Sequence, residues 1–338
     1  MKKILVVAII ILSCAGNELF SQKISSEVLY SSYYGGTGTD DADVVAVDKA
    51  GNTYLGCHSS STHLPGANKY PYTLSGGMDA FIVKLNNRGT AVDYLLKLGG
   101  SKWDAIQGLK TDSLGNIYAV GTTYSPDFLI NANAFQPNFG GKSDAFVLKI
   151  NPEGKIIWST FLGGKKDEDG RDITIDKQGN VHIIGRTASK DFPTSNGAIQ
   201  SKLAGGIGAF VATFDTNGKM LMSTYLGGSG DDIGFSIGMN NTDKLYIGGT
   251  TNSLDFPVKN AIQLKNKGKN DVFMAVIDKD RSAIEFASYL GGEDTDQLYN
   301  IDFDASGDLF VMGVTSSSNY PTTTGVFQPN FSGERDAF

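Results

Sequence analysis

Apolar and polar residues alternate along most of this chain, in short runs that end at Gly, Asn or Asp. One stretch shows four such runs in succession: Arg171–Asp176 (RDITID), Val181–Gly185 (VHIIG), Ala209–Asp215 (AFVATFD) and Met220–Leu226 (MLMSTYL). Runs of five to seven residues, rich in β-branched and aromatic side chains and separated by turn residues, predict antiparallel strands joined as a meander.

The same pattern returns every 64 residues. Gly-Gly pairs recur at this step, at residues 35–36, 99–100, 163–164, 227–228 and 291–292. An apolar position keeps it too: Val45, Leu109, Ile173, Ile237 and Ile301. A lone four-stranded sheet leaves its apolar faces uncovered, and packing sheets around an axis buries them. The sequence therefore predicts an all-β fold, a β-propeller of four-stranded antiparallel blades. A β-helix is the rival, but its coils are usually shorter than this repeat.

Five units are expected, beginning near residues 28, 92, 156, 220 and 284, and we name their strands A to D from the axis outward. Strand C is predicted at residues 80–86, 145–151, 209–215 and 272–278, and its fifth copy has only begun at residues 336–338. The chain opens with a predicted strand at Val28–Tyr34, which matches strand D and would close the ring. We therefore expect a propeller domain over residues 22–338 whose last unit is incomplete, as in a chain truncated at its C-terminus.

Turn residues recur with the strands. An Asp precedes a turn that ends in Gly four times, at Asp48, Asp112, Asp176 and Asp304, and Asn240 takes this place once. We expect each side chain to accept a backbone N–H and each Gly to adopt a positive φ. The Gly-Gly pairs are expected to let the chain swing sharply from one unit into the next.

The repeated residues resemble a known family. They are Asp144–Lys149 (DAFVLK), Gly154, Trp158–Gly164 (WSTFLGG) and Thr187–Thr194 (TASKDFPT), which are similar to the SBBP repeat of bacterial β-propellers. The resemblance covers nearly all of residues 22–338. The first copy departs most, because Cys57 replaces a Gly and His63-Leu64-Pro65 replaces Asp-Phe-Pro. The resemblance implies an exported or surface protein of a bacterium, and it implies no catalytic activity.

The N-terminus has the pattern of an export signal. Lys2 and Lys3 precede an apolar run from Ile4 to Leu12, which is too short to span a bilayer. We expect a signal peptide over residues 1–21 and a secreted or cell-surface protein. Cys14 offers an alternative, lipidation as an outer-membrane lipoprotein. No transmembrane segment is predicted in the mature chain.

Composition excludes several classes of protein. A hydrophobic share of 40% excludes a disordered chain, and 42 Gly without a three-residue period exclude collagen. The net charge of −7 argues against nucleic acid as a partner. With two Cys there is neither a disulfide scaffold nor a Cys-rich metal site, and Cys57 is expected to be a buried, inert thiol.

One acid follows each Gly-Gly pair by four residues: Asp40, Asp104, Glu168, Asp232 and Asp296. These acids fall between strand D of one unit and strand A of the next, and we expect them on the same face as the long connection from B to C. Two interpretations are open. The carboxylates could form a ring that binds Ca²⁺ or basic groups, or each could accept backbone N–H bonds within its own loop.

Catalytic patterns are weak. His58, His63 and His182 do not recur at the repeat step; the first two could bind a metal or serve as polar loop residues, and His182 is expected to pack in strand B. Arg171 and Arg186 depart from the repeat without an evident partner. An aromatic series could stack on sugars, but we expect it to anchor the long loops: Phe128, Phe192, Phe256 and Tyr320.

The sequence favours a non-enzymatic binding or adhesion scaffold that contacts protein or glycan at the cell surface, with no cofactor other than calcium. Repetition supports this interpretation, because catalysis needs one distinctive site and a scaffold tolerates several similar ones. A propeller enzyme acting on polysaccharide, a lyase or hydrolase, is the first alternative, since fold does not fix function. A passive structural segment of a larger surface protein is the second.

Overall fold

The structure, a computed structural model, describes residues 28–131 and 133–338. The chain divides into two compact units, residues 1–31 and 32–338, and the fold described below is that of the second. The expected signal peptide and Cys14 lie outside the described residues. Within the described ranges every regular element is a strand, and no helix could cross a membrane.

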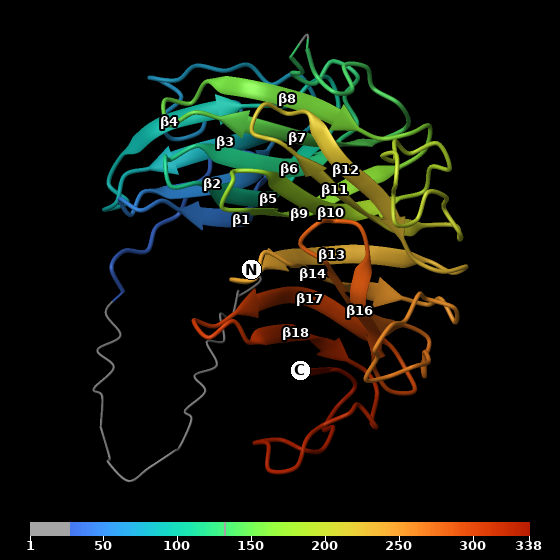
Figure 1. The fold of residues 1–338 in the computed structure, drawn as a ribbon. Coiled ribbons are helices and arrows are strands. Elements are labelled where there is room, and N and C mark those ends of the chain that lie inside the picture. The colour runs from blue at the N-terminus through green and yellow to red at the C-terminus, as the bar shows by residue number, and fades with distance from the viewer. Residues whose placement is uncertain (1–27, 132) are drawn as a thin grey trace. The chain divides into compact units, whose positions relative to one another are not determined.

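Strands follow one another in five sheets, each in chain order (Figure 1). The first sheet contains β1 (Asp40–Val47), β2 (Thr53–Ser59), β3 (Asp79–Leu85) and β4 (Val92–Lys97). The second contains β5 (Asp104–Thr111), β6 (Ile117–Thr123), β7 (Asp144–Ile150) and β8 (Ile156–Leu162). The third contains β9 (Glu168–Ile175), β10 (Val181–Thr187), β11 (Gly208–Phe214) and β12 (Met220–Leu226). The fourth contains β13 (Asp232–Met239), β14 (Leu245–Thr251), β15 (Asp271–Ile277) and β16 (Ile284–Leu290). The fifth contains β17 (Asp296–Phe303), β18 (Leu309–Thr315) and the short β19 (Asp336–Ala337).

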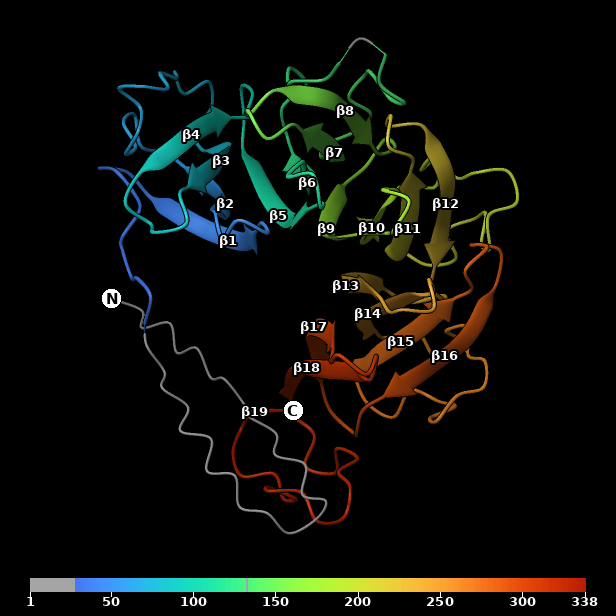
Figure 2. The ribbon, with the colours of Figure 1, turned by 60° about the vertical axis from the view of Figure 1, so that its left-hand side comes forward.

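The sheets are the blades of a propeller, as predicted. Every strand pairs with its neighbours in antiparallel fashion, and the first strand of each blade lies near the centre while the fourth lies at the periphery (Figure 2). The inner strands β1, β5, β9, β13 and β17 contact one another in that order. Apolar side chains from adjacent blades fill the space between them, so that the apolar faces of neighbouring blades bury each other.

The predicted turns between the first two strands are confirmed. In the third blade, Asp176 Oδ1 accepts the backbone N–H groups of Gln178 at 2.9 Å and Asn180 at 2.8 Å. Gly179 has a φ of 83°, a conformation that side chains other than Gly adopt only with strain. The same bonds recur at Asp48 and Asp112.

The Gly-Gly pairs have a different cause from the one expected. Their φ values lie outside the left-handed region, so conformational freedom does not explain them. Instead, a Cβ on Gly163 would meet the carboxyl groups of Asp144 and Glu168, and one on Gly164 would meet Ser189, each at less than 3.0 Å. Glycine is required because the backbone passes directly against buried side chains.

Strand boundaries differ slightly from the prediction. The inner strand of the third blade begins at Glu168, three residues before the predicted Arg171, because a bulge between Gly170 and Asp172 interrupts the alternation. The third strands begin one residue earlier than expected, at the Asp or Gly that precedes the apolar run. The outer strand Met220–Leu226 lies where it was predicted.

The expected opening strand at Val28–Tyr34 is wrong. Its described residues have no strand assignment, and the fifth blade has three strands. An outer strand there would need a full third strand to pair with, but β19 comprises two residues and pairs with β18 through Val314 and Thr315 alone. The last blade is incomplete, as the sequence predicted.

The long connection between the second and third strands packs along the outer strand. In the third blade, Tyr225 N–H donates to Gln200 O at 3.1 Å, and Gln200 N–H donates to Thr224 Oγ1 at 2.8 Å. The connection therefore covers an edge whose backbone groups would otherwise be unpaired. Phe192 lies beneath it with its ring centroid 4.6 Å from that of Phe210, which supports the prediction of a loop anchor.

One face of the first blade and one face of the fifth blade are less well covered by neighbouring residues. Val45 of β1 is 58% exposed, whereas its counterparts Leu109, Ile173, Ile237 and Ile301 are between 0% and 7% exposed. On β18, Phe310 and Met312 are 44% and 54% exposed. Among the described residues, the first and fifth blades thus each lack a packed neighbour on one face.

Candidate functional site

The five acids predicted as a possible ring are each held inside their own loop. Asp232 accepts the backbone N–H of Gly228 at 2.8 Å and the hydroxyl groups of Thr251 at 2.5 Å and Ser253 at 2.9 Å. Asp40 has the equivalent bonds from Gly36, Ser59 and Ser61. Burial raises the pKa of Asp232, and the hydrogen bonds to it act in the opposite direction.

This arrangement recurs in every blade. The second Gly of each pair donates to the acid in all five copies: Asp40, Asp104, Glu168, Asp232 and Asp296. Four of the five are fully buried, so the face is not lined with open carboxylates as expected. No group of three or more His, Cys, Asp or Glu residues within the described ranges could hold a metal ion. The geometry favours the second interpretation, bonding within each loop, and calcium binding stays a prediction.

A second series of acids faces the first, and the sequence analysis missed it. These residues begin the third strands: Asp79, Asp144, Asp271 and Asp336, with Gly208 in the third blade. The Gly between the two series marks their proximity, since a Cβ on Gly291 would lie 2.7 Å from both Asp271 Oδ1 and Asp296 Oδ2. The motif was visible as DAF in three copies and as DVF in the fourth, but nothing in it indicated that its acid meets the acid of the next blade.

Asp144 and Asp104, which belong to two of these pairs, have raised pKa values. Burial, helped by the charge of Glu168, raises the pKa of Asp144 to about 7. Burial likewise raises the pKa of Asp104 to about 6, with a contribution from Asp79. At the first pair Lys97 provides a counter-charge, its Nζ lying 3.4 Å from Asp79 Oδ1. Asp144 and Asp104 therefore retain a proton at a higher pH than an ordinary Asp does.

The inner strands share a structural feature whose residue changes from blade to blade. Each has a β-bulge at the same position, where one residue is left out of the pairing register. Bulges redirect a side chain and are frequent beside functional sites. The five bulge residues are chemically unlike: Asp43, Gln107, Arg171, Phe235 and Tyr299. We call the surface formed by them and by their near neighbours, on and directly beside the first two strands of each blade, the axial surface.

On the first two blades the axial surface is acidic and aromatic. Asp43 Oδ2 lies 2.7 Å from His58 Nδ1, and this hydrogen bond raises the pKa of His58. The His58 ring lies edge-on to Trp103 at 5.8 Å, and Trp103 lies at 5.7 Å from Tyr124. Trp103 and Tyr124 are 36% and 38% exposed, so both present part of their surface to solvent.

On the third blade the axial surface is cationic. Arg171 and Arg186, which lacked a partner in the sequence, both bind Asp169 Oδ2. The Arg171 guanidinium lies 4.9 Å from the centre of the Phe235 ring on the next blade, a cation–π contact. In the fifth blade Tyr299 is 47% exposed. The 64-residue step already gives these five residues one repeat position, but only the strand register shows that the position is a bulge.

The predicted histidines and Cys57 have different surroundings. His58 belongs to the axial surface, and no metal partner joins it to His63. His182 is 1% exposed and bridges Thr213 Oγ1 at 2.9 Å and Asp176 Oδ2 at 3.3 Å, as expected of a packed imidazole. Cys57 is buried, and burial raises the pKa of its thiol to about 12, which makes it inert.

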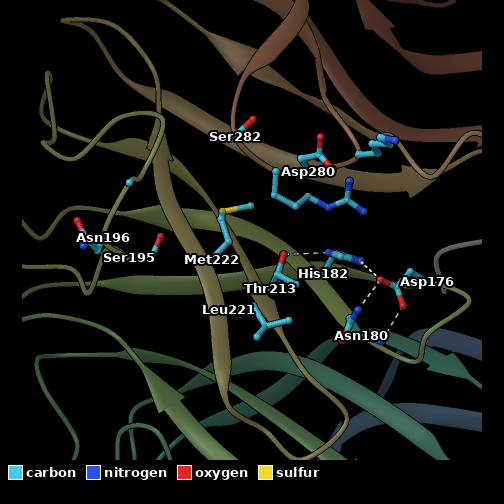
Figure 3. A pocket seen from close by; sticks show the side chains of 13 residues that line it. Asp176, Asn180, His182, Ser195, Asn196, Thr213, Leu221, Met222, Asp280 and Ser282 are labelled. Carbon is cyan, nitrogen blue, oxygen red and sulfur yellow. Dashed lines mark hydrogen bonds and ion pairs between the residues drawn. The ribbon is translucent and has the colours of Figure 1, made fainter.

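One pocket stands apart from the axial surface. It lies between the third and fourth blades, beside the turns that join the first to the second strand and the third to the fourth, and has a volume of about 360 Å³. Asp176, Asn180 and His182 line it from one blade and Asp280 and Ser282 from the next (Figure 3).

The comparisons with known proteins support the fold. Residues 157–193 match the family model of the SBBP β-propeller repeat. No curated protein matches the chain.

Solved structures are similar at low identity. A protein of unknown function from Dyadobacter fermentans is 11% identical, with a TM-score of 0.47, and the match covers 85% of this chain and 78% of that one. One of unknown function from Bacteroides caccae is 12% identical, with a TM-score of 0.43, over 80% and 70% of the two chains. A GH43_1 enzyme from Xanthomonas citri is 10% identical, with a TM-score of 0.38, over 85% and 84%. Such distant similarity carries no argument about function. The chain carries the SBBP β-propeller repeat.

Proposed function

We propose that this protein is a non-enzymatic binding scaffold, exported or held at the cell surface, which captures a protein or glycan on its axial surface. The observation that supports this is the set of five unlike residues at one bulge position. The packing positions repeat closely from blade to blade, so the scaffold does not require this variation.

The chemistry of the axial surface suits recognition better than catalysis. Asp43 is hydrogen-bonded to His58, and Asp169 is shared by the cations Arg171 and Arg186, so both acids already have partners. Exposed aromatic rings beside charged and amide side chains are typical of binding sites for glycans and proteins. The charged and amide side chains lie on strands, which hold them rigidly, and Trp103 and Tyr124 lie next to the ends of β5 and β6.

An array of glycans and matrix proteins tests this proposal. Wild-type protein is expected to bind a restricted set of spots, and Trp103→Ala is expected to weaken that binding at least tenfold. Leu114→Ala is the matched control, because Leu114 is 78% exposed in a turn away from the axial surface, and it should leave binding unchanged. Blank arrays, or equal binding by the Trp103→Ala protein, would contradict the proposal.

A further inference from the structure

The pocket between the third and fourth blades exists because the repeat is broken there. In the preceding blade Trp158 fills the equivalent space: its Nε1–H donates to Thr216 O at 3.0 Å, and its ring lies against Gly218 in the turn of the next blade. In the first blade Tyr94 lies against Gly154 in the same way. One repeat after Trp158 stands Met222, which has no ring to fill the space.

The opposing turn changes as well. Gly89, Gly154 and Gly218 occupy this turn in the first three blades, with φ values between 65° and 86°. The fourth blade has Arg281 there, with a φ of 59°. A large side chain in this conformation is strained, and such strain often accompanies a binding role. The wall of the pocket differs too, since His182 stands where Tyr118 and Tyr246 lie in the neighbouring blades.

Arg281 is fixed in place with one donor unused. Its Nη1 donates to Asp243 O and Asp278 O, both at 2.8 Å, which fixes the guanidinium between two turns of the fourth blade. Its Nε is buried and has no hydrogen-bond partner. Lys279 also lines the pocket and forms no ion pair among the described residues. Two cationic side chains at the pocket thus retain free donors.

The acidic residues near Arg281 either have hydrogen-bond partners of their own or are exposed at the edge of the pocket. Asp176 accepts bonds from Gln178, Asn180 and His182, and these bonds lower the pKa of Asp176 to about 2. Asp280 is exposed. Asp243 and Asp278 offer Arg281 their backbone carbonyl oxygens. The charges of Asp176, Asp278, Asp243 and Asp280 all act on Arg281. None of these carboxyl groups bonds to Arg281 Nε, which is left to bind an external acceptor.

We propose that this pocket binds an acidic sugar of the hexuronate class. The ligand carboxylate accepts from Arg281 Nε and Lys279, and the hydroxyl groups bond with the amides of Asn180 and Asn196. One face of the sugar ring packs on Met222, where the neighbouring blade has an indole. A volume of about 360 Å³ is enough for such a ligand. This site is separate from the axial surface, so either could fail without the other.

Titration calorimetry with galacturonate and glucuronate tests the assignment. At least one uronate is expected to bind, and the matching neutral sugar, galactose or glucose, to bind at least tenfold more weakly. Acetate alone is expected to bind at least tenfold more weakly than the uronate, because it lacks the ring and hydroxyl groups. Binding of a neutral sugar or of acetate as tight as that of the uronates would overturn the ligand class, and no binding of either uronate would overturn the site.

Two variants restore the repeat and separate binding from folding. Arg281→Gly and Met222→Trp introduce the residues that the neighbouring blades carry at these positions, so both should fold with unchanged or higher Tm. Each is expected to abolish uronate binding. Arg88→Gly, in the equivalent turn of the first blade, removes an exposed Arg and should bind as the wild type does. Wild-type affinity in a folded Arg281→Gly protein would overturn the proposal.

Discussion

At the scale of the residue, glycine has two roles that the sequence does not distinguish. Gly179 is required for a positive φ, and a turn pattern of Asp followed by Gly predicts this from local chemistry alone. Gly227 is required for space, because a Cβ there would lie less than 3.0 Å from the carboxyl group of Asp232. The second role depends on a side chain five residues away that folds back beneath the backbone, so the sequence shows the repetition of the pair and not its cause.

The close contact between Gly227 and Asp232 predicts a loss of stability when a side chain is added at residue 227. Gly227→Ala is expected to lower the free energy of unfolding by about 1–3 kcal/mol, because the added methyl group overpacks against Asp232. Gly77→Ala is the control, since a Cβ there meets nothing within 4 Å. Urea denaturation of both proteins measures the difference, and equal stabilities would contradict the steric explanation.

At the scale of the element, strand patterns were predicted well and long-range partners were not. Met220–Leu226 follows from its apolar alternation and flanking turns. The path of the long connection does not, because its backbone bonds run to Thr224 and Tyr225 of the outer strand, more than twenty residues away. The predicted strand at Val28–Tyr34 failed for a related reason: its own residues favour a strand, but a strand forms only with a partner.

The loop anchor can be tested directly. Phe192 is 3% exposed and contacts Phe210 and Tyr225. Phe192→Ala is expected to lower the free energy of unfolding by about 3–5 kcal/mol, since it leaves a cavity under the connection. Leu254→Ala removes a side chain that is 79% exposed and should change stability by less than about 0.5 kcal/mol. Thermal or urea unfolding that shows similar losses in both variants would argue against an anchor.

At the scale of the whole molecule, acid pairs at the blade interfaces couple stability to pH. The pKa of Asp144 is about 7 and that of Asp104 about 6 in the folded chain, while an unfolded Asp titrates near ~3.9. Between about pH 7 and pH 4 the folded state therefore holds protons that the unfolded state releases. Stability should rise as pH falls through this window and be lost as pH rises through the folded pKa values.

Thermal unfolding at a series of pH values measures this effect. The Tm is expected to be higher at pH 5 than at pH 8, and to fall again below pH 4, where Asp176, whose pKa is about 2, begins to lose its bonds. Asp144→Asn removes one titrating group, so its Tm should change less between pH 8 and pH 5. A wild-type Tm that falls over this range, or an unchanged slope in the variant, would refute the assignment.

The candidate sites show that residues which recur in every repeat are a poor guide to function in this chain. The five acids after the Gly-Gly pairs attracted attention because they recur, and the structure places them in structural bonds within their loops. The axial surface and the pocket consist of residues that do not recur. Arg171 and Arg186 stood out in the sequence, but their shared partner Asp169 became evident only once the strand register was known.

The central claim is that the unlike residues of the axial surface, and not the repeated ones, bind the ligand. Its most direct test is the stoichiometry of binding for the ligand that the array identifies, measured by titration calorimetry on wild-type and Trp103→Ala proteins. The account predicts one ligand per chain, with an affinity at least tenfold weaker in the variant. Several equivalent ligands per chain, with no effect of the substitution, would mean that the repeated positions bind, and would contradict the account.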